Sequence, residues 1–335
     1  MSGVFIIAEL SANHNNDFDL AVRTIEAMAS SGADAIKLQT YTADSLSLDV
    51  DNEFFGPKKD GLWKGRRPYE LYQEASMPYE WQPRLKKIAE DLGMIFFSSP
   101  FDLQAVDFLE GINVPMYKIA SFEITDIPLI EYTASKGKPM IISTGVAELD
   151  DIELALKTCR AVGNNDITLL KCTSQYPASI DQANLSTMVD MRKRFGVKVG
   201  VSDHTMGSLV PTVAVALGAK VIEKHFILDR NLGGPDSSFS MEPHEFAQMV
   251  RSVREAELSL GNINYEVAER DKLRRRSLFI VQDIKAGEVI TEENVRSIRP
   301  GFGLHPRYFK GILGKRVNKH LFYGDPVNLK SVNDD

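Results

Sequence analysis

The sequence predicts an α/β protein, a (β/α)8 TIM barrel followed by a small β-rich domain. Eight short apolar runs recur along the first 226 residues. Each run is rich in Ile, Val, Phe or Leu and is followed by a stretch of helical periodicity. Eight strand-then-helix units in a row are typical of this barrel, whose catalytic groups gather at the C-terminal ends of the strands. Nearly every run ends in a reactive side chain, which indicates an enzyme with one polar mouth.

The strands and helices can be placed in order along the chain. The predicted strands begin at Val4, Asp34, Met94, Met116, Pro139, Ile167, Val197 and Ala219. Residues 19–31, 150–162 and 242–259 carry apolar faces and are each followed closely by glycine, which supplies the left-handed conformation that ends a helix. One interval, residues 42–78, is much longer than the others. Such insertions usually shape or cover the catalytic side of a barrel, although a surface excursion without a catalytic role is the alternative.

The pattern changes after Gly261. We expect a barrel domain over residues 1–262, a charged linker over residues 263–276 and a compact domain over residues 277–335, where short β-rich pieces alternate with glycine turns. A domain of about 60 residues is marginally stable alone. We therefore expect it to dock on another surface.

Composition limits the partners. The chain is 43% hydrophobic and 25% charged, as is ordinary for a soluble globular protein. A net charge of −7 argues against nucleic acid, and the apolar runs are shorter than the roughly 20 residues that span a membrane. The two cysteines are too few for a disulfide framework, and no export signal is apparent. These features predict a cytoplasmic protein.

Two histidines predict a metal site. His204 and His225 end the seventh and eighth predicted strands, and neighbouring strand ends lie close together. Imidazole suits Mn, Zn, Fe or Co, and a two-histidine site leaves positions for water and a substrate oxygen. One of them could instead be a hydrogen-bonded core residue. The flanking acids Asp203 and Glu223 favour the site.

Two lysines predict an anion pocket. Lys37 and Lys118 lie inside apolar runs, where burying an unpaired ammonium group costs several kcal/mol. A bound anion would remove that cost, and a salt bridge to Glu9 or Glu223 is the alternative. Gln39 shares a strand face with Lys37. Hydroxyl groups follow other predicted strands, at Ser99, Ser121, Ser143 and Ser202. Cations and hydroxyls that converge on one cavity suit a phosphate or carboxylate group.

Carboxylates complete the predicted site. Glu9 ends the first predicted strand, and Glu123 follows the fourth. Either could act as general base if burial and neighbours adjust its pKa. Asp236 lies in the loop after the eighth strand, where a Gly-Gly-Pro segment could bring it over the mouth.

Ten motifs along nearly the whole chain together resemble the sialic acid synthase family. They are IIAELSANHN, IKLQTY, FSSPFD, YKIASFEI, IISTG, KCTSQYP, VSDHT, GAKVIEKHF, GPDSSFSMEP and IRPGFG. The C-terminal part resembles the family's antifreeze-like (SAF, β-clip) domain. The resemblance implies a transferase that condenses phosphoenolpyruvate with an N-acylated amino sugar, releasing phosphate and forming a nine-carbon 2-keto acid.

Within the family, the motifs are most similar to those of the pseudaminic acid synthases. This rests on LSANHN, LQTYTADSLSLD, GLWKGRRPYELYQEA and CTSQYP. The implied sugar is 2,4-diacetamido-2,4,6-trideoxy-altrose, and synthesis of N-acetylneuraminic or legionaminic acid is the alternative. Ser174 stands where N-acetylneuraminic acid synthases have asparagine, which weakens a phosphoenolpyruvate contact carried over to this position.

The resemblance also implies roles for single residues. His204 and His225 would bind a divalent metal, usually Mn²⁺, with Mg²⁺ or Co²⁺ as alternatives. From the chemistry of the strand ends and the mechanism it suggests, we expect Glu123, Glu9, Lys118 and His225 to be the catalytic residues. Phosphoenolpyruvate contacts would fall on Lys37, Ser99, Lys118, Ser121, Ser143 and Ser202, and Ser174 is kept as a further substrate-binding candidate. Sugar contacts would fall on Glu9, Gln39, Tyr176 and Asp236. Arg299 matches the arginine that the antifreeze-like domain inserts into the partner's barrel, which implies a domain-swapped homodimer.

Three other functions fit parts of the pattern. A synthase of a heptulosonate or octulosonate would need a second basic cluster for the phosphate of its sugar, and none stands out at the strand ends. A metal-dependent hydrolase would leave Lys37 and Lys118 without a role. A carbohydrate-binding protein would not need the ring of polar strand ends.

Overall fold

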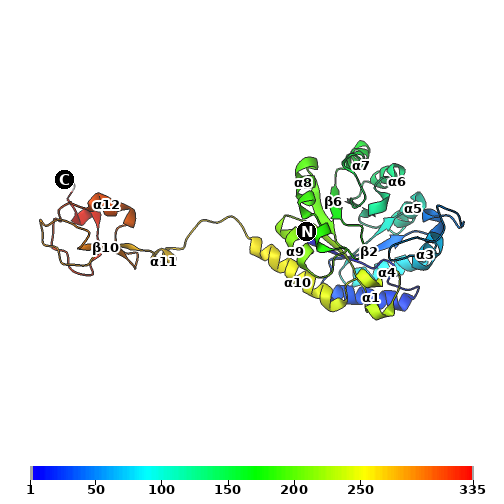
Figure 1. Ribbon diagram of the computed structural model, residues 1–335, viewed down its shortest axis with the longest axis horizontal. Coiled ribbons are helices and arrows are strands. Elements are labelled where there is room, and N and C mark those ends of the chain that lie inside the picture. Colours follow the sequence, from blue (N-terminus) through cyan, green and yellow to red (C-terminus); the bar gives the residue numbers. More distant parts are fainter. Residues whose placement is uncertain (1–2, 334–335) are drawn as a thin grey trace. The chain divides into compact units, whose positions relative to one another are not determined.

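The computed structural model describes residues 3–333 of the chain, which divides into two compact units, residues 1–261 and 262–335. Figure 1 shows the elements of each unit. Within residues 3–333, no helix is both long and apolar enough to cross a membrane.

The first unit is a closed barrel of eight parallel strands, which confirms the predicted fold. The strands follow one another around the barrel in chain order: β1 (Phe5–Glu9), β2 (Ala35–Thr40), β3 (Ile95–Pro100), β4 (Tyr117–Ile119), β5 (Met140–Ser143), β6 (Ile167–Cys172), β7 (Lys198–Ser202) and β8 (Val221–His225). The barrel closes where β8 pairs with β1, and in that register Glu9 lies opposite His225.

Helices surround the strands (Figure 1). They are α1 (Phe18–Ser30), α4 (Gln82–Asp91), α5 (Leu103–Gly111), α6 (Ile127–Ala134), α7 (Leu149–Ala161), α8 (Leu185–Phe195), α9 (Leu209–Ala216) and α10 (Pro243–Leu260). The first of them shows why they form. The Asp17 side chain accepts a hydrogen bond from the Leu20 amide at 3.0 Å and so caps α1. Ile25 and Met28 on its apolar face are fully buried, and each such side chain contributes about 1.5–3 kcal/mol.

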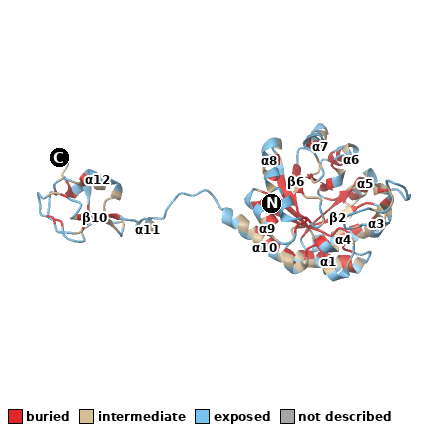
Figure 2. Cartoon of the chain, viewed as in Figure 1, coloured by how far each residue is buried: buried red, intermediate tan, exposed pale blue. Residues whose placement is uncertain are grey.

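Alternation along the strands makes two cores. Outward positions such as Ile6 and Ile36 belong to a large cluster shared with the helices, whereas inward positions form a smaller cluster inside the barrel. The inner cluster consists of Phe5, Ile7, Ala35, Phe97, Ile141, Leu170 and Val221. Figure 2 shows the strands as the buried centre of this unit. Two residues beyond every inner apolar position except Phe5, the same strand face carries a polar residue or Cys172, because side chains alternate with period two.

The long insertion, residues 42–78, is ordered. It contains α2 (Ala43–Leu46) and α3 (Pro68–Ala75). Between them the chain doubles back, since the Lys58 amide donates to the Arg66 carbonyl at 3.0 Å and the Gly65 amide donates to the Lys58 carbonyl at 2.8 Å. The segment is therefore a folded part of the barrel unit.

The second unit has its own small core. Strands β9 (Ser277–Ile280) and β10 (Val295–Ile298) are antiparallel, and the unit also contains α11 (Glu269–Lys272) and α12 (Phe309–Ile312). Much of the rest is extended chain joined by isolated bridges, such as Ile284 with Leu321. The core consists of Leu278, Ile280, Ile284, Ile290, Val295, Ile312, Val317, Leu321, Val327 and Val332.

Candidate active site

The polar strand ends meet inside the mouth of the barrel as two buried ion pairs. Lys118 on β4 donates to both carboxylate oxygens of Glu223 on β8, at 2.8 and 2.9 Å. Lys37 on β2 pairs with Glu9 on β1. All four side chains are almost completely buried. The salt bridges considered as the alternative from sequence are therefore present.

Charge compensation decides the ionisation of these groups. Burial alone would raise the pKa of Glu223, but the positive charges of Lys118 and Lys37 outweigh it and lower the pKa to about 2. Burial lowers the pKa of Lys37, but the nearby Glu223 and Glu9 carboxylates raise it above its ordinary value. The pKa of Lys118 is instead lowered, because burial and the nearby Lys37 charge outweigh the Glu223 carboxylate. The two lysines therefore differ, with Lys37 held in its charged form more firmly than Lys118.

Glu223 is the central residue that the predicted site left out, although the sequence had named it as an acid beside a histidine and as a possible salt-bridge partner of the lysines. Its carboxylate also accepts a hydrogen bond from Ser202 Oγ at 3.0 Å. The signal was its spacing: Glu223 and His225 lie two residues apart on one strand, so they face the same interior.

The two histidines are neighbours, as predicted. Their ring centroids are 5.2 Å apart. His204 Nδ1 lies 2.9 Å from the Thr173 carbonyl, and a carbonyl can only accept, so this nitrogen carries a proton. Burial lowers the pKa of His204, but hydrogen bonding to Cys172 and to the Thr173 carbonyl outweighs it and raises the pKa above its ordinary value. His225 Nδ1 is buried without a hydrogen-bond partner among the described residues, and burial lowers the pKa of His225 well below its ordinary value. The neutral imidazole of His225 can bind a metal, and His204 would have to lose its second proton to do the same.

The donor set around the histidines is small. Within the described part of the chain, no group of three or more His, Cys, Asp or Glu side chains is arranged to hold a metal ion. A cation bound here would therefore take His204 and His225 as its protein ligands and keep other positions for water or substrate oxygens. The rings are held in place by Phe239, whose centroid lies 4.9 Å from that of His225.

Glu123 is placed as a candidate general base. It ends a 3₁₀ turn (Ser121–Glu123) that directly follows β4 and lines the mouth cavity. Burial raises its pKa to about 7, so both the acid and the carboxylate are populated near neutral pH. Its Oε2 is buried without a hydrogen-bond partner in residues 3–333, which leaves that oxygen available for a substrate or a water.

Hydroxyl groups line the adjoining strand ends. Ser121 Oγ and Ser174 Oγ are 2.9 Å apart. Gly145 lies against this pair: a Cβ added there would overlap Ser174 Oγ and come within 2.6 Å of Ser121 Oγ. Ser99 Oγ accepts from Lys37 at 3.3 Å, and Ser143 Oγ is buried and, among the described residues, unpartnered. The predicted serines therefore lie at the barrel mouth, and glycine at position 145 keeps the space before two of them open.

A cavity of about 360 Å³ opens above this floor. The predicted sugar contacts Gln39, Tyr176 and Asp236 line it, whereas Glu9 lies buried below. The insertion supplies much of the upper wall, through Leu46, Lys58, Trp63, Leu71, Tyr72 and Ala75. The insertion therefore shapes the site, as predicted. Lys58, Trp63 and Tyr72 were missed, because an insertion without periodicity gives no signal for which side chains turn inward.

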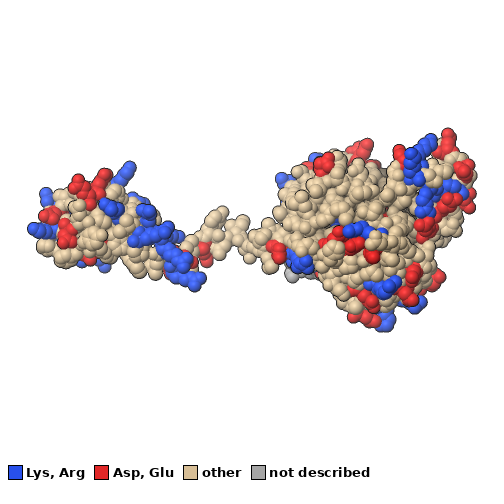
Figure 3. All heavy atoms as spheres, turned by 60° about the horizontal axis from the view of Figure 1, so that its bottom comes forward, with Lys and Arg blue, Asp and Glu red and all other residues tan. Residues whose placement is uncertain are grey.

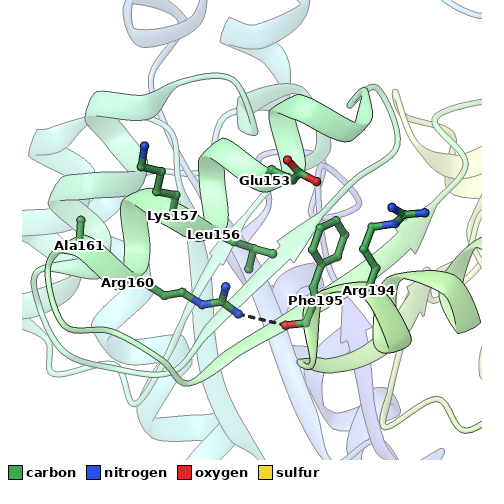
Figure 4. Close-up of a pocket in the computed structure, with 7 residues that line it drawn as sticks. All are labelled: Glu153, Leu156, Lys157, Arg160, Ala161, Arg194 and Phe195. Atoms are coloured by element: carbon green, nitrogen blue, oxygen red, sulfur yellow. Dashed lines mark hydrogen bonds between the residues drawn. The ribbon is translucent and has the colours of Figure 1, made fainter.

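A wider hollow of about 560 Å³ lies elsewhere, on the outside of the barrel between α7 and α8. Figure 4 shows Arg160, which donates to the Phe195 carbonyl at 3.1 Å, across its floor. None of the predicted site residues lines this hollow. The enclosed mouth cavity, with its titratable groups, is the better candidate for catalysis.

Arg299 belongs to the second unit. It immediately follows β10 and is exposed on that unit's surface. Its predicted contact with a partner's barrel is taken up below as a proposal.

Comparison with known proteins identifies the family. Residues 24–265 match the model of the NeuB family. The chain belongs to the NeuB family. Residues 275–332 match the SAF domain, so the antifreeze-like unit expected from the sequence is confirmed. As a NeuB-family chain the protein is an enzyme, as predicted.

Relatives cover the chain almost completely. It is 47% identical to pseudaminic acid synthase from Helicobacter pylori, over 98% of this chain and 97% of the relative. It is 39% identical to N,N'-diacetyllegionaminic acid synthase from Legionella pneumophila, over 96% and 92%. Among solved structures, N-acetylneuraminic acid synthetase from Leptospira borgpetersenii matches with a TM-score of 0.71 and 34% identity, over 81% of this chain and 90% of that one.

Proposed function

We propose that this NeuB-family enzyme is a pseudaminic acid synthase, which condenses phosphoenolpyruvate with 2,4-diacetamido-2,4,6-trideoxy-altrose and water, giving pseudaminic acid and phosphate. The observation that carries the proposal is the 47% identity to a pseudaminic acid synthase over 98% of the chain. The legionaminic acid synthase is less similar, at 39%. The site supports the chemistry, since it combines buried cations, paired imidazoles and a carboxyl group that titrates near neutral pH.

Phosphoenolpyruvate would bind at the buried ion pairs. Its phosphate and carboxylate would share the Lys37 and Lys118 ammonium groups with Glu9 and Glu223, and hydroxyls such as Ser121 and Ser174 would donate further hydrogen bonds. Neither lysine has to be desolvated on binding, because both are already buried. The cost of burying these charges is thus met when the protein folds.

The sugar would bind as its open-chain aldehyde, with its carbonyl toward His204 and His225. A divalent metal held by these histidines, for which we propose Mn²⁺, would supply Lewis-acid polarisation of that carbonyl. Gln39, Tyr176 and Asp236 would orient the rest of the sugar. Holding two substrates in register accounts for much of the acceleration, since effective molarity lowers barriers by about 7–11 kcal/mol.

The bond changes then follow. C3 of phosphoenolpyruvate attacks the aldehyde carbon, and positive charge develops at its C2. Water adds to C2 while Glu123 takes its proton, which the pKa of about 7 permits near neutral pH. The tetrahedral intermediate releases phosphate by cleavage of the C2–O bond as its C2 hydroxyl loses a proton and becomes the ketone. The former aldehyde oxygen becomes a hydroxyl by taking the proton that Glu123 received from the water, and the 2-keto acid remains.

A homodimer would complete the site. We propose that Arg299 of one subunit reaches the partner's barrel mouth. The two units have opposite net charges, which supports such an association. Residues 262–335 carry 14 Lys and Arg and 10 Asp and Glu. Subtraction from the totals of 39 and 46 leaves 25 Lys and Arg and 36 Asp and Glu in residues 1–261. Figure 3 shows Lys and Arg side chains grouped on the second unit beside the connector. Opposite charges speed docking and favour the correct partner surface.

We place the enzyme in the cytoplasm, where free thiols persist. Cys159 and Cys172 are both buried and unpaired, which suits a reducing compartment.

Phosphate release from phosphoenolpyruvate tests the function. With Mn²⁺ present, we expect turnover with the diacetamido-trideoxy-altrose and none with N-acetylmannosamine. Turnover with the latter would keep the family chemistry but reject the sugar. Isotope from ¹⁸O-labelled water should appear in the keto acid, and its appearance in phosphate would reject C–O cleavage.

A further inference from the structure

The insertion brings one cation to the mouth cavity. Its cations are Lys58, Lys59, Lys64, Arg66 and Arg67. The two arginines are neutralised by ion pairs, which include Glu74 and Asp49. Lys59 and Lys64 are exposed. Lys58, by contrast, is half-buried and lines the cavity. Among the described residues that line this cavity, it is the one with a fixed positive charge.

Lys58 has unused hydrogen-bonding capacity. Its Nζ lies 4.8 Å from the centroid of the Trp63 ring, a cation–π contact that leaves N–H groups free. Burial lowers the pKa of Lys58, and no carboxylate in the described part of the chain offsets this effect. An ammonium group without a counterion in a partly dry cavity favours a ligand that presents a strong acceptor.

Trp63 gives this cation an apolar neighbour in a fixed position. Its Nε1 donates to the Pro235 carbonyl at 3.0 Å, in the residue before the predicted sugar contact Asp236. Its ring centroid lies 6.0 Å from that of Tyr176. The indole therefore joins the insertion to the loops that follow β6 and β8, with a ring beside the space for the sugar.

The order of these side chains indicates which part of the sugar they meet. The Tyr176 ring lies 4.5 Å from the His204 ring and 6.0 Å from the Trp63 ring, so Tyr176 connects the histidine to the insertion. A sugar whose aldehyde faces the histidines extends past Tyr176 toward Trp63 and Lys58. The proposed substrate carries two acylamino groups, each with a carbonyl acceptor and an apolar methyl group.

We propose that Lys58 and Trp63 form a subsite for the acylamino group farther from the aldehyde. The Lys58 ammonium donates to the amide carbonyl, and the acyl methyl packs on the indole. This inference rests on the proposed function, since it requires a sugar with a second acylamino group. It makes the insertion a determinant of sugar specificity.

Steady-state kinetics of Lys58→Met test the subsite. Methionine keeps the length of the side chain and removes its charge and donors. We expect the KM for the diacetamido sugar to rise about 10- to 100-fold, as for loss of a charged hydrogen bond, while the KM for phosphoenolpyruvate changes less than about twofold. Lys58→Arg keeps a donor and should recover part of the loss. Lys59→Met and Lys64→Met make the same charge change on the same loop and should behave as wild type.

The alternatives give different results. A rise in the KM for phosphoenolpyruvate equal to that for the sugar would make Lys58 a general anion contact and overturn the subsite. Unchanged kinetics in Lys58→Met would also overturn it, yet would leave the proposed function standing. A wild-type enzyme that does not use the diacetamido sugar would reject the proposed function itself. Melting temperatures equal to wild type would show that each variant is folded.

Discussion

Lys118 and Glu223 form a hydrogen-bonded ion pair across the interior of the barrel, with Nζ–Oε distances of 2.8 and 2.9 Å. Their strands, β4 and β8, lie on opposite sides of a closed barrel of eight. The pair therefore links two halves of the barrel and also supplies a cation to the site. These two roles can be separated by mutation.

Glu223→Gln should destabilise the fold. Removing one member of a buried pair leaves the other charge uncompensated, and the free energy of unfolding should fall by about 3–5 kcal/mol. Denaturant unfolding measures this change. Asp91→Asn, which breaks the exposed pair with Lys87, is the matched control and should cost at most about 1 kcal/mol. Equal effects of the two substitutions would contradict a structural role for the buried pair.

Substitutions of the two members of this pair should have different effects on the KM for phosphoenolpyruvate. Lys118→Met removes a cation from the anion pocket, so the KM for phosphoenolpyruvate should rise at least about 10-fold. Glu223→Gln removes the competing carboxylate, so that KM should not rise even though turnover falls. If both variants lost phosphoenolpyruvate affinity alike, the pair would act only as a structural unit.

Gly145→Ala should impair substrate binding. The added methyl would come within 2.6 Å of Ser121 Oγ and overlap Ser174 Oγ, which fills the space before these hydroxyls. We expect the KM for phosphoenolpyruvate to rise about 10-fold or more, a cost of roughly 1.4 kcal/mol or more. Gly111→Ala, where an added Cβ meets nothing within 4 Å, is the control. Normal kinetics in Gly145→Ala would remove the two serines from the phosphoenolpyruvate site.

The pH dependence of kcat/KM should report Glu123. Its pKa of about 7 means that the carboxylate, the form that accepts a proton, is lost as the pH falls through this value. The rate should therefore decline about tenfold per pH unit below pH 7, and Glu123→Gln should lower the rate and abolish that limb. Persistence of the limb in the variant would assign it to another group.

The metal and the dimer can be tested with the same variants. A chelator should abolish turnover, and Mn²⁺ should restore it in the wild type but not in His225→Ala. In a domain-swapped dimer, Arg299→Ala and His225→Ala damage the same site from different subunits. Mixed dimers of these two variants should thus regain up to about half of the wild-type activity per dimer, since one site then carries both substitutions and the other neither. Failure to regain activity would place Arg299 in its own subunit's site or in none.

The sequence predicted the barrel and most of the polar ring because both depend on simple periods. Alternation places Lys37, Gln39 and Glu9 on inward faces, and strand order then brings His204 beside His225. Ion pairing was harder to predict, because Glu9 and Glu223 were each possible partners for either lysine. The strand register and the barrel geometry determine which glutamate pairs with which lysine.

The upper part of the cavity could not be predicted from period or propensity. Lys58 and Trp63 lie in a loop whose shape is set by backbone hydrogen bonds between residues 58 and 66 and by contacts with the β8 loop. Such contacts depend on tertiary packing. In the sequence, Gly145 is only the last residue of a motif. That a glycine is needed there to leave room for two serine hydroxyls can be seen only in the three-dimensional structure.

The pairing of Glu9 with His225 at the barrel seam has a consequence for biosynthesis. The first strand and the last strand each contribute polar residues to the barrel mouth, and 215 residues lie between these two positions. On the ribosome, β1 emerges early and has no partner on that edge until β8 has left the exit tunnel. A nascent chain therefore holds an unpaired strand edge for most of its synthesis, and no truncated product that ends before residue 221 can acquire a competent reaction centre.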